Sequence, residues 1–167
     1  MNIDTTDKNL SERFHFWIKE ISPNMAPYSH KLNLKLVENS YLYQLDTNKY
    51  RIYLRGVKKA IEIFREENIP LFTEMETKQQ EYGTIAAKMS IEVDGKKLTM
   101  QKASQLLKDT NREKREKIYH KISERRLEDR DILDTLYDEL ISLRHQIAQN
   151  AGFENYRDYM FSAMGRF

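Results

Sequence analysis

The absence of glycine and proline between Gly95 and Gly152 constrains the fold of this chain more than any other sequence feature. Glycine and proline are the strongest helix breakers, so a segment without them can form a very long helix. Thr110 and Glu113 have the spacing of a capping box, and the Asn-Ala-Gly sequence ending at Gly152 provides a helix stop. These signals predict one helix over about 111–150, which would be about 60 Å long at 1.5 Å per residue.

Apolar residues recur at steps of three and four along this predicted helix and form one seam. The seam consists of Ile118, Ile122, Leu133, Leu136, Leu140, Leu143 and Ile147. A helix with such a seam needs a packing partner and cannot be a lone surface helix. The charged Arg126 and Asp129 occupy two of the expected apolar positions. We expect the helix to bend there, or these charges to face solvent or a cleft.

Apolar spacing predicts shorter helices elsewhere in the chain. They cover residues 10–21, 47–64, 70–89, 99–107 and 155–164. Thr5 and Thr6 are candidate caps of the first helix, and Pro23 is expected to end it. Pro70 fits the first turn of its helix, because its missing N–H costs nothing there. Residues 31–37 fit either a strand or a helix, and a helix is favoured because no turn or partner strand lies nearby.

The Asp94-Gly95 pair is the strongest turn signal, because a two-residue type I′ turn needs positive φ at both positions. With these residues as the loop, Ile91 faces Leu98 and apolar residues share one face. The predicted fold is therefore mainly α: an antiparallel helical array with one long helix, about 111–150, and a small β-hairpin near 89–99. We expect residues 1–167 to form a single helical region.

Composition excludes several classes of function. Lys and Arg total 28 against 26 Asp and Glu, and a net charge of +2 produces no field that favours nucleic acid or an anionic membrane. No apolar run is long enough to span a membrane, and the N-terminus, with Asp4 and Asp7, does not resemble a signal peptide. Cysteine is absent, which excludes disulfides and thiolate metal sites and fits a cytoplasmic location.

Histidines are the first candidates for catalysis or metal binding. His15 follows Glu12 with the Glu-x-x-His spacing of di-iron bundles, but this element occurs only once, so an ordinary helix histidine is favoured. His120 lies one helical turn from both Glu116 and Glu124 and could form a metal half-site. The surrounding mixed charges favour a solvated face instead. A metalloenzyme built on these residues would retain stoichiometric metal after dialysis.

The two remaining histidines have simpler interpretations. We expect His145 to interact with the carbonyl groups at the end of the long helix, and His30 to be a cap or loop residue. No histidine is followed by another four residues later, which excludes a His-Glu-x-x-His zinc motif in this chain. The glycines are too scattered for a phosphate-binding loop, a dinucleotide fingerprint or a nucleophile elbow.

The ten tyrosines raise the question of a stacking or substrate-binding surface. Most lie on the predicted apolar stripes, so core packing with the hydroxyl at the boundary is favoured. Tyr41, Tyr43 and Tyr156 are the least committed to a core position.

A known family is indicated by residues 144–161, RHQIAQNAGFENYRDYMF, together with Gly-Arg-Phe at 165–167. This stretch resembles the helix-turn-helix that precedes the catalytic half of oligoendopeptidase F-type enzymes, within the thimet-oligopeptidase-like zinc metallopeptidases. Residues 4–7 (DTTD), 29–36 (SHKLNLKL) and 108–115 (KDTNREKR), with the hairpin, occur in the order these enzymes show. The resemblance covers essentially the whole chain, and its C-terminal piece is the most specific.

The resemblance implies an internal piece from the N-terminal half of a longer peptidase, whose zinc motif lies downstream of this region. It implies a non-catalytic helical portion of a zinc-dependent oligopeptidase that hydrolyses short peptides, forming part of the wall of the substrate channel. No catalytic, cofactor-binding or metal-binding residue is assigned in this chain; zinc belongs to the parent enzyme, and the chain alone is expected to be inactive. Apolar surface exposed by truncation would favour self-association.

The alternative is a helical protein-interaction module, or partial coiled coil, with no enzymatic parent. In that interpretation the long helix binds a partner through its seam.

Overall fold

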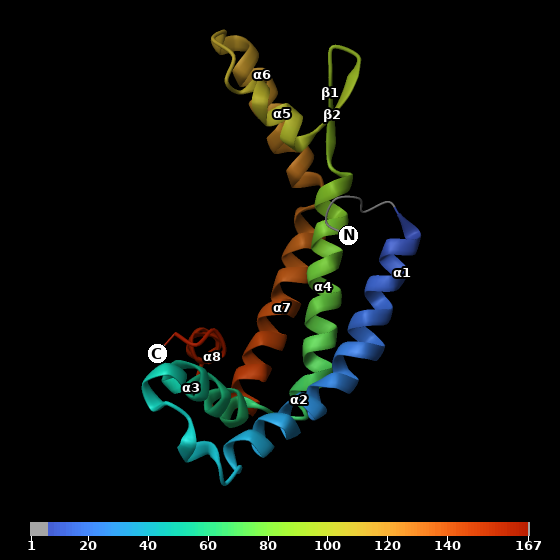
Figure 1. The fold of residues 1–167 in the computed structure, drawn as a ribbon. Helices are drawn as coiled ribbons and strands as arrows, with labels where there is room; N and C mark the ends of the chain where they lie inside the picture. The colour runs from blue at the N-terminus through green and yellow to red at the C-terminus, as the bar shows by residue number, and fades with distance from the viewer. Residues whose placement is uncertain (1–6, 167) are drawn as a thin grey trace. The chain divides into compact units, whose positions relative to one another are not determined.

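The structure is a computed structural model that describes residues 7–166. It is mainly α-helical with a two-stranded antiparallel hairpin, which confirms the predicted fold class (Figure 1). The chain divides into two compact units. We call Lys78–Glu139 the hairpin unit, and residues 8–77 together with 140–166 the helical unit. No helix within residues 7–166 is both long enough and apolar enough to cross a membrane.

The helical unit begins with three segments that follow one another without a break: α1 (Lys8–Phe16), the π-helical turn η1 (Trp17–Ile21) and α2 (Ser22–Val37). The prediction that Pro23 ends the first helix is therefore wrong. Pro23 lies in the first turn of α2, and the helix continues through it although proline supplies no N–H at this position. Residues 31–37 are helical, as favoured from the sequence. The predicted caps Thr5 and Thr6 lie outside the described residues.

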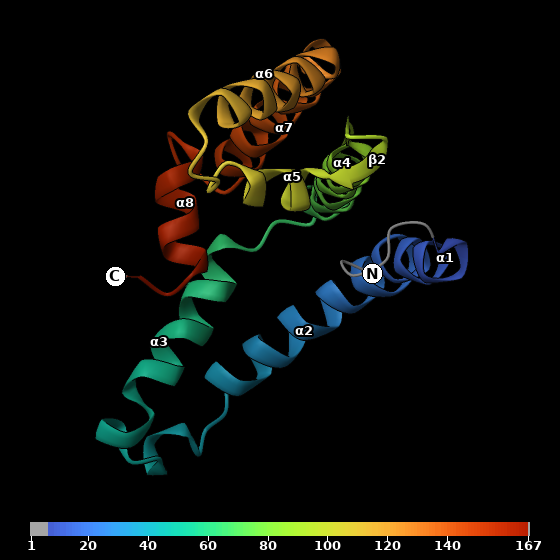
Figure 2. The same ribbon diagram turned by 90° about the horizontal axis from the view of Figure 1, so that it is seen from above.

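A connection with the short 3-10 turn η2 (Leu42–Gln44) joins α2 to α3 (Thr47–Ile63), as Figure 2 shows. The cap of α3 is Asp46, whose Oδ1 accepts hydrogen bonds from the backbone N–H groups of Asn48 and Lys49 at 2.9 and 3.1 Å. This carboxylate satisfies two of the N–H groups that a helix start leaves without partners. The helix α3 contacts α2.

Three further helices contribute to the helical unit: α4 (Asn68–Lys88), α7 (Arg130–Asn150) and α8 (Tyr156–Ala163). Pro70 lies in the first turn of α4, as predicted. Asn68 is only 1% exposed and connects α4 to α7. Its Nδ2 donates to the carbonyl oxygen of Ile147 at 3.0 Å, and its Oδ1 accepts from Nδ2 of Asn150 at 2.7 Å. Both polar atoms of the buried amide are therefore paired, as burial requires.

The stop after α7 and the start of α8 follow the sequence signals. Gly152 has φ +84°, and the N–H of Phe153 donates to the carbonyl oxygen of Ala148 at 2.9 Å, the geometry of a helix ending in a left-handed residue. Asn155 then caps α8, with its Oδ1 accepting from the N–H of Asp158 at 3.0 Å. The helix-turn-helix predicted for this stretch is therefore present.

The hairpin unit contains β1 (Ser90–Val93), β2 (Lys96–Thr99), α5 (Met100–Leu106) and α6 (Arg112–Glu128). Ile91 pairs with Leu98, and the turn residues Asp94 and Gly95 have φ values of 51° and 73°, so the predicted register and turn are confirmed. Thr99 caps α5 as expected. The core of this unit joins β1 to both helices through Ile91, Ala103, Ile118 and Ile122.

The stretch predicted as one long helix is helical over 112–150 except at Asp129, which separates α6 from α7. Asp129 has φ −99° and ψ 9°, and its carboxylate lies 2.6 Å from the guanidinium of Arg125. The charged positions that interrupt the apolar seam therefore mark the helix boundary. The capping-box prediction at Thr110 is wrong by one residue, because Asn111 Oδ1 accepts from the N–H of Lys114 at 3.1 Å.

Candidate functional site

The described histidine candidates belong to no group of three or more side chains placed to hold a metal ion. His15 lies on α1, and its Nδ1 is buried without a hydrogen-bond partner among the described residues. Its ring meets Phe14 edge to face at 6.0 Å, while Glu12 is exposed. The structure thus places the Glu-x-x-His element on a helix, and nothing in the described chain completes a di-iron arrangement.

His120, Glu116 and Glu124 all lie exposed on α6, on the solvated face that the mixed charges predict. The imidazole of His120 contacts the ring of Tyr119, with centroids 5.7 Å apart. Within residues 7–166, no group of three or more His, Asp or Glu side chains is placed to hold a metal ion. The described chain therefore provides no donor set for zinc.

The other two histidines, His145 and His30, lie in different environments. His145 is exposed on the last turns of α7. The prediction that His30 is a cap or loop residue is wrong, because α2 continues through this position. The imidazole of His30 stacks on Phe64, with centroids 4.0 Å apart and planes 12° from parallel, and so contributes to the contact between α2 and the end of α3.

The prediction that most tyrosines pack in a core is wrong. Seven of the ten are exposed: Tyr28, Tyr41, Tyr43, Tyr53, Tyr82, Tyr119 and Tyr137. Tyr53 and Tyr82 lie on two predicted stripes, one on α3 and one on α4. Helical spacing did not reveal whether these positions are covered. The described chain therefore exposes more aromatic surface than the sequence predicts.

Tyr156 and Tyr159 form an aromatic pair on α8, in which Tyr159 is buried and Tyr156 is half-buried. Their rings stack with centroids 5.7 Å apart, and the guanidinium of Arg144 lies 5.8 Å from the Tyr156 ring. Burial, with a smaller contribution from Tyr156, raises the pKa of Tyr159 to about 12. Burial also raises the pKa of Tyr156, partly offset by Arg144. Through Tyr156, this pair connects α8 to Arg144 of α7 and to Met75 of α4.

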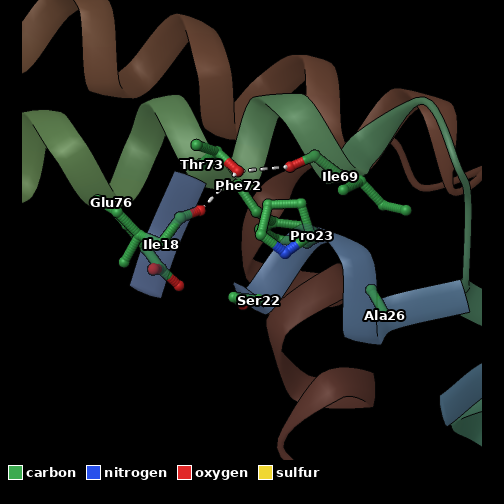
Figure 3. Close-up of a pocket in the computed structure, with 8 residues that line it drawn as sticks. All are labelled: Ile18, Ser22, Pro23, Ala26, Ile69, Phe72, Thr73 and Glu76. Carbon is green, nitrogen blue, oxygen red and sulfur yellow. Dashed lines mark hydrogen bonds between the residues drawn. The ribbon is translucent and has the colours of Figure 1, made fainter. Parts of the chain in front are cut away.

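A pocket of about 240 Å³ lies in the helical unit, and the sequence did not reveal it (Figure 3). We call it the η1–α2–α4 pocket, and it is lined by Ile18, Ser22, Pro23, Ala26, Ile69, Phe72, Thr73 and Glu76. In Figure 3 the α4 residues follow one another along one side of the pocket, with Ser22, Pro23 and Ala26 on the facing helix. The walls are thus mainly apolar.

The backbone of the pocket has an unusual hydrogen-bond pattern that follows from proline chemistry. In η1 the N–H of Ser22 donates to the carbonyl oxygen of Trp17, which is the i to i+5 pattern of a π-helix. Continuing this pattern would require an N–H at residue 23, which proline lacks. The carbonyl oxygen of Ile18 instead accepts from Oγ1 of Thr73 at 3.2 Å. Figure 3 shows this bond between η1 and α4.

Glu76 is the charged side chain of the pocket. It is exposed, and no described residue forms an ion pair or hydrogen bond with its carboxylate. Pairing an apolar wall with a few polar groups is the usual composition of a ligand site. The η1–α2–α4 pocket therefore has apolar walls and one carboxylate available to a cationic group.

A second pocket, in the hairpin unit, has a different composition. It measures about 290 Å³ and is lined by residues from the turn of the hairpin and from α6, including Asp94, Glu113, Lys114 and Lys117. Lys114 is paired with Asp109 at 2.6 Å, and this contact lowers the pKa of Asp109 and raises that of Lys114. The mixture of charges on exposed side chains selects no ligand.

An exposed apolar stripe runs along η1 and α2. Trp17, Met25, Tyr28 and Leu32 are 52 to 69% exposed and recur at helical spacing. Isolated exposed apolar residues are normal on proteins, but a helical stripe of four large side chains indicates a contact surface. The exposed apolar surface expected from the sequence is therefore present in the helical unit.

Comparison with known proteins finds one family model that matches part of the sequence and several solved structures with a similar fold. Residues 1–64 match the family model described as the peptidase M3 N-terminal domain. The structure of a protein described as an oligoendopeptidase F, from Bacillus anthracis str. Ames, matches with a TM-score of 0.90 at 22% identity, covering 98% of this chain and 30% of that chain. No curated protein matches the sequence.

Two further solved structures show the same likeness. PZ peptidase A, solved with an inhibitor, matches with a TM-score of 0.89 at 20% identity, over 98% of this chain and 29% of that chain. A 3.1 Å structure described as an oligoendopeptidase F matches with a TM-score of 0.89 at 19% identity, over 97% of this chain and 28% of that chain. The chain thus shares its fold with these proteins over nearly its whole length and spans less than a third of theirs.

Proposed function

We propose that this chain, whose first 64 residues match the peptidase M3 N-terminal domain and whose fold is that of oligoendopeptidase F, is a non-catalytic helical portion of a zinc-dependent oligopeptidase. In this proposal its helices form part of the wall of a channel that admits short peptides. The observation that carries the proposal is the likeness in fold, which extends over 98% of the chain.

The proposal assigns the zinc ligands to other parts of the whole enzyme. Zinc is the metal implied by the family, but residues 7–166 provide no group of His, Asp or Glu placed to hold it. We therefore assign no catalytic step and no metal ligand to this chain. In the whole enzyme, zinc would be held by residues elsewhere and would supply the activated water that attacks the peptide carbonyl.

The proposal includes short peptides as substrates of the whole enzyme and a cytoplasmic location, with neither nucleic acid nor membrane as partner. The near balance of 28 basic and 26 acidic residues and the absence of cysteine support these assignments. A channel that admits only short, unfolded peptides needs walls that remain rigid. The buried Asn68 network and the cap of α8 are features that would keep the helical unit rigid.

A chimaera tests the proposal. The segment of the Bacillus anthracis oligoendopeptidase F that matches this chain would be replaced by residues 1–167, and hydrolysis of a quenched fluorescent peptide would be measured with added zinc. We expect the chimaera to hydrolyse the peptide, whereas the enzyme with the same segment deleted should not. Circular dichroism and thermal unfolding show whether each protein is folded. A folded chimaera without activity would contradict the proposal.

For the alternative of a helical interaction module, the burial of the seam is evidence against it, and the exposed stripe of η1 and α2 is evidence for it. Its proposed binding seam is largely buried within the chain: Ile118 and Ile147, for example, are 3% and 0% exposed. The seam is therefore not available to a partner. The exposed stripe of η1 and α2 still favours a protein contact of some kind. The proposed channel wall and a contact surface on the same helices are compatible.

A further inference from the structure

We propose that the η1–α2–α4 pocket binds the apolar amino-terminal residue of an oligopeptide, with Glu76 accepting hydrogen bonds from its ammonium group. The inference rests on the proposed function for its class of ligand, because that function makes oligopeptides the molecules these helices encounter. Binding itself requires only residues of this chain and can be measured without catalysis.

The size and the walls of the pocket select one apolar residue. Ligand sites for small molecules usually span roughly 300 to 1,000 Å³, so a pocket of about 240 Å³ holds a single residue rather than a cofactor. Ile69 and Phe72 of α4 face Pro23 and Ala26 of α2 across it. Burying a Leu or Phe side chain against such walls contributes about 1.5 to 3 kcal/mol when the burial is complete.

The carboxylate of Glu76 selects a cation beside that apolar side chain. It lies at the end of the α4 row shown in Figure 3, and no described residue pairs with it. The amino-terminal residue of a peptide carries an apolar side chain and an ammonium group on the same carbon atom. A pocket for one residue can therefore contact both groups at once, which an internal residue of a peptide cannot offer.

The two prolines of α2 add a backbone acceptor to the same stretch. Pro27 has no N–H, so it cannot supply the α-helical partner of the carbonyl oxygen of Pro23, four residues earlier. The equivalent acceptor at Ile18 is already taken by Thr73. An ammonium group has three N–H donors, and the Glu76 carboxylate is an acceptor of the kind it requires.

Binding can be measured with three tripeptides on the 167-residue chain. The probes are Leu-Gly-Gly, its N-acetyl form and N-acetyl-Lys-Gly-Gly, titrated while amide and indole resonances are followed by NMR; Trp17, which precedes Ile18, is the single tryptophan. We expect saturable shifts at pocket residues with Leu-Gly-Gly. Because the carboxylate is exposed, N-acetylation should weaken binding about three- to fivefold. Equal or tighter binding of the lysine peptide would overturn the assignment to the amino terminus.

Two matched variants locate the binding. Glu76→Gln should weaken binding of Leu-Gly-Gly by the same three- to fivefold and abolish the effect of acetylation. Glu74→Gln changes an exposed carboxylate of the same helix that does not line the pocket, and it should bind as the wild type does. Ala26→Leu fills the pocket and should abolish saturable binding, with its fold checked by thermal unfolding.

The outcomes separate this inference from the proposed function. Absence of saturable binding by the wild-type chain, or binding that Glu76→Gln leaves unchanged, overturns the inference even if the chimaera is active. Binding with the expected dependence on Glu76 and on the free amino group supports it even if the chimaera is inactive.

Discussion

At the scale of single residues, Asn68 is the polar group whose loss should cost most. Asn68→Ala removes the donor to Ile147 and the acceptor of Asn150 from a site that is 1% exposed. An unsatisfied buried polar group costs about 1 to 3 kcal/mol, so the free energy of unfolding should fall by that amount. The melting temperature should fall by roughly 2 to 4 °C per kcal/mol for a chain of this size.

Thermal unfolding followed by circular dichroism measures this change. Glu67→Ala, an exposed neighbour outside the network, is the control and should stay within about 0.5 kcal/mol of the wild type. If both variants melt together with the wild type, the Asn68 network does not stabilise the helical unit.

The phenol of Tyr159 gives a prediction for alkaline pH. Burial raises its pKa to about 12, whereas an unfolded tyrosine ionises near 10. The folded state therefore retains this proton where the unfolded state loses it, so stability that is fully present below about pH 10 declines as the pH rises toward 12. Tyr159→Phe should lose less stability than the wild type between pH 9 and pH 11.

Urea unfolding midpoints at the two pH values provide the measurement. Tyr28→Phe, at a position that is 69% exposed, serves as the control and should follow the wild type. An equal decline in midpoint for Tyr159→Phe and the wild type would show that this phenol does not titrate as the structure indicates.

Residue-level interpretation of the sequence succeeded where the signal is local. Asn155, Thr99 and Gly152 act at the helix ends where their types predict. It failed for Asn68 and the Thr73 bond, because both depend on atoms 55 to 82 residues away in the chain. No spacing rule places a buried amide opposite a carbonyl on another helix.

At the scale of elements, alanine substitutions at two glycines with open surroundings should have opposite effects on the stability of the chain. A Cβ added at Gly152 or at Gly83 meets no atom within 4 Å, so the backbone conformation alone decides the outcome. Gly152 has φ +84° at the end of α7, and Gly152→Ala should cost about 1 to 2 kcal/mol. Gly83 lies inside α4, and Gly83→Ala should stabilise the chain by roughly 0.5 to 1 kcal/mol.

Each alanine variant serves as the matched control of the other, since both add one methyl group. Chemical denaturation should therefore move the two midpoints in opposite directions. A shift of the same sign in both variants would show that something other than backbone conformation determines their stability.

The elements that the sequence predicts best are those defined by neighbouring residues. The hairpin, with Asp94 and Gly95 at its turn, has the predicted register, and the helical stretch of 112–150 is interrupted only where charges replace apolar residues. The π-helical turn was missed because proline is ordinarily a helix terminator. At Pro23 the orphaned carbonyl of Ile18 finds a hydroxyl on α4, so the helix can continue. The η1–α2–α4 pocket was not predicted either, because Pro23, which lines it, was expected to end the helix.

At the scale of the whole molecule, the exposed stripe predicts concentration-dependent self-association of the isolated chain. Met25, Tyr28 and Leu32 are more than half exposed on one helix, and burying such side chains is favourable. Sedimentation equilibrium should therefore show a weight-average mass that rises with concentration. The double variant Met25→Glu, Leu32→Lys should remain at the 20.0 kDa of the monomer.

The control for this measurement is Glu62→Lys combined with Lys58→Glu, which exchanges charges between exposed positions of α3 and leaves the stripe intact. It should associate as the wild type does. A wild-type chain that stays monomeric at all concentrations would show that the stripe does not mediate association between copies.

We propose that this chain supplies structure to a peptidase while the reacting groups lie elsewhere. The most direct test is hydrolysis of a quenched fluorescent peptide by the purified 167-residue chain with added zinc, with its bound metal measured after dialysis. We predict no hydrolysis above the zinc-containing buffer and less than stoichiometric zinc. Zinc-dependent hydrolysis that co-elutes with the chain would contradict the account.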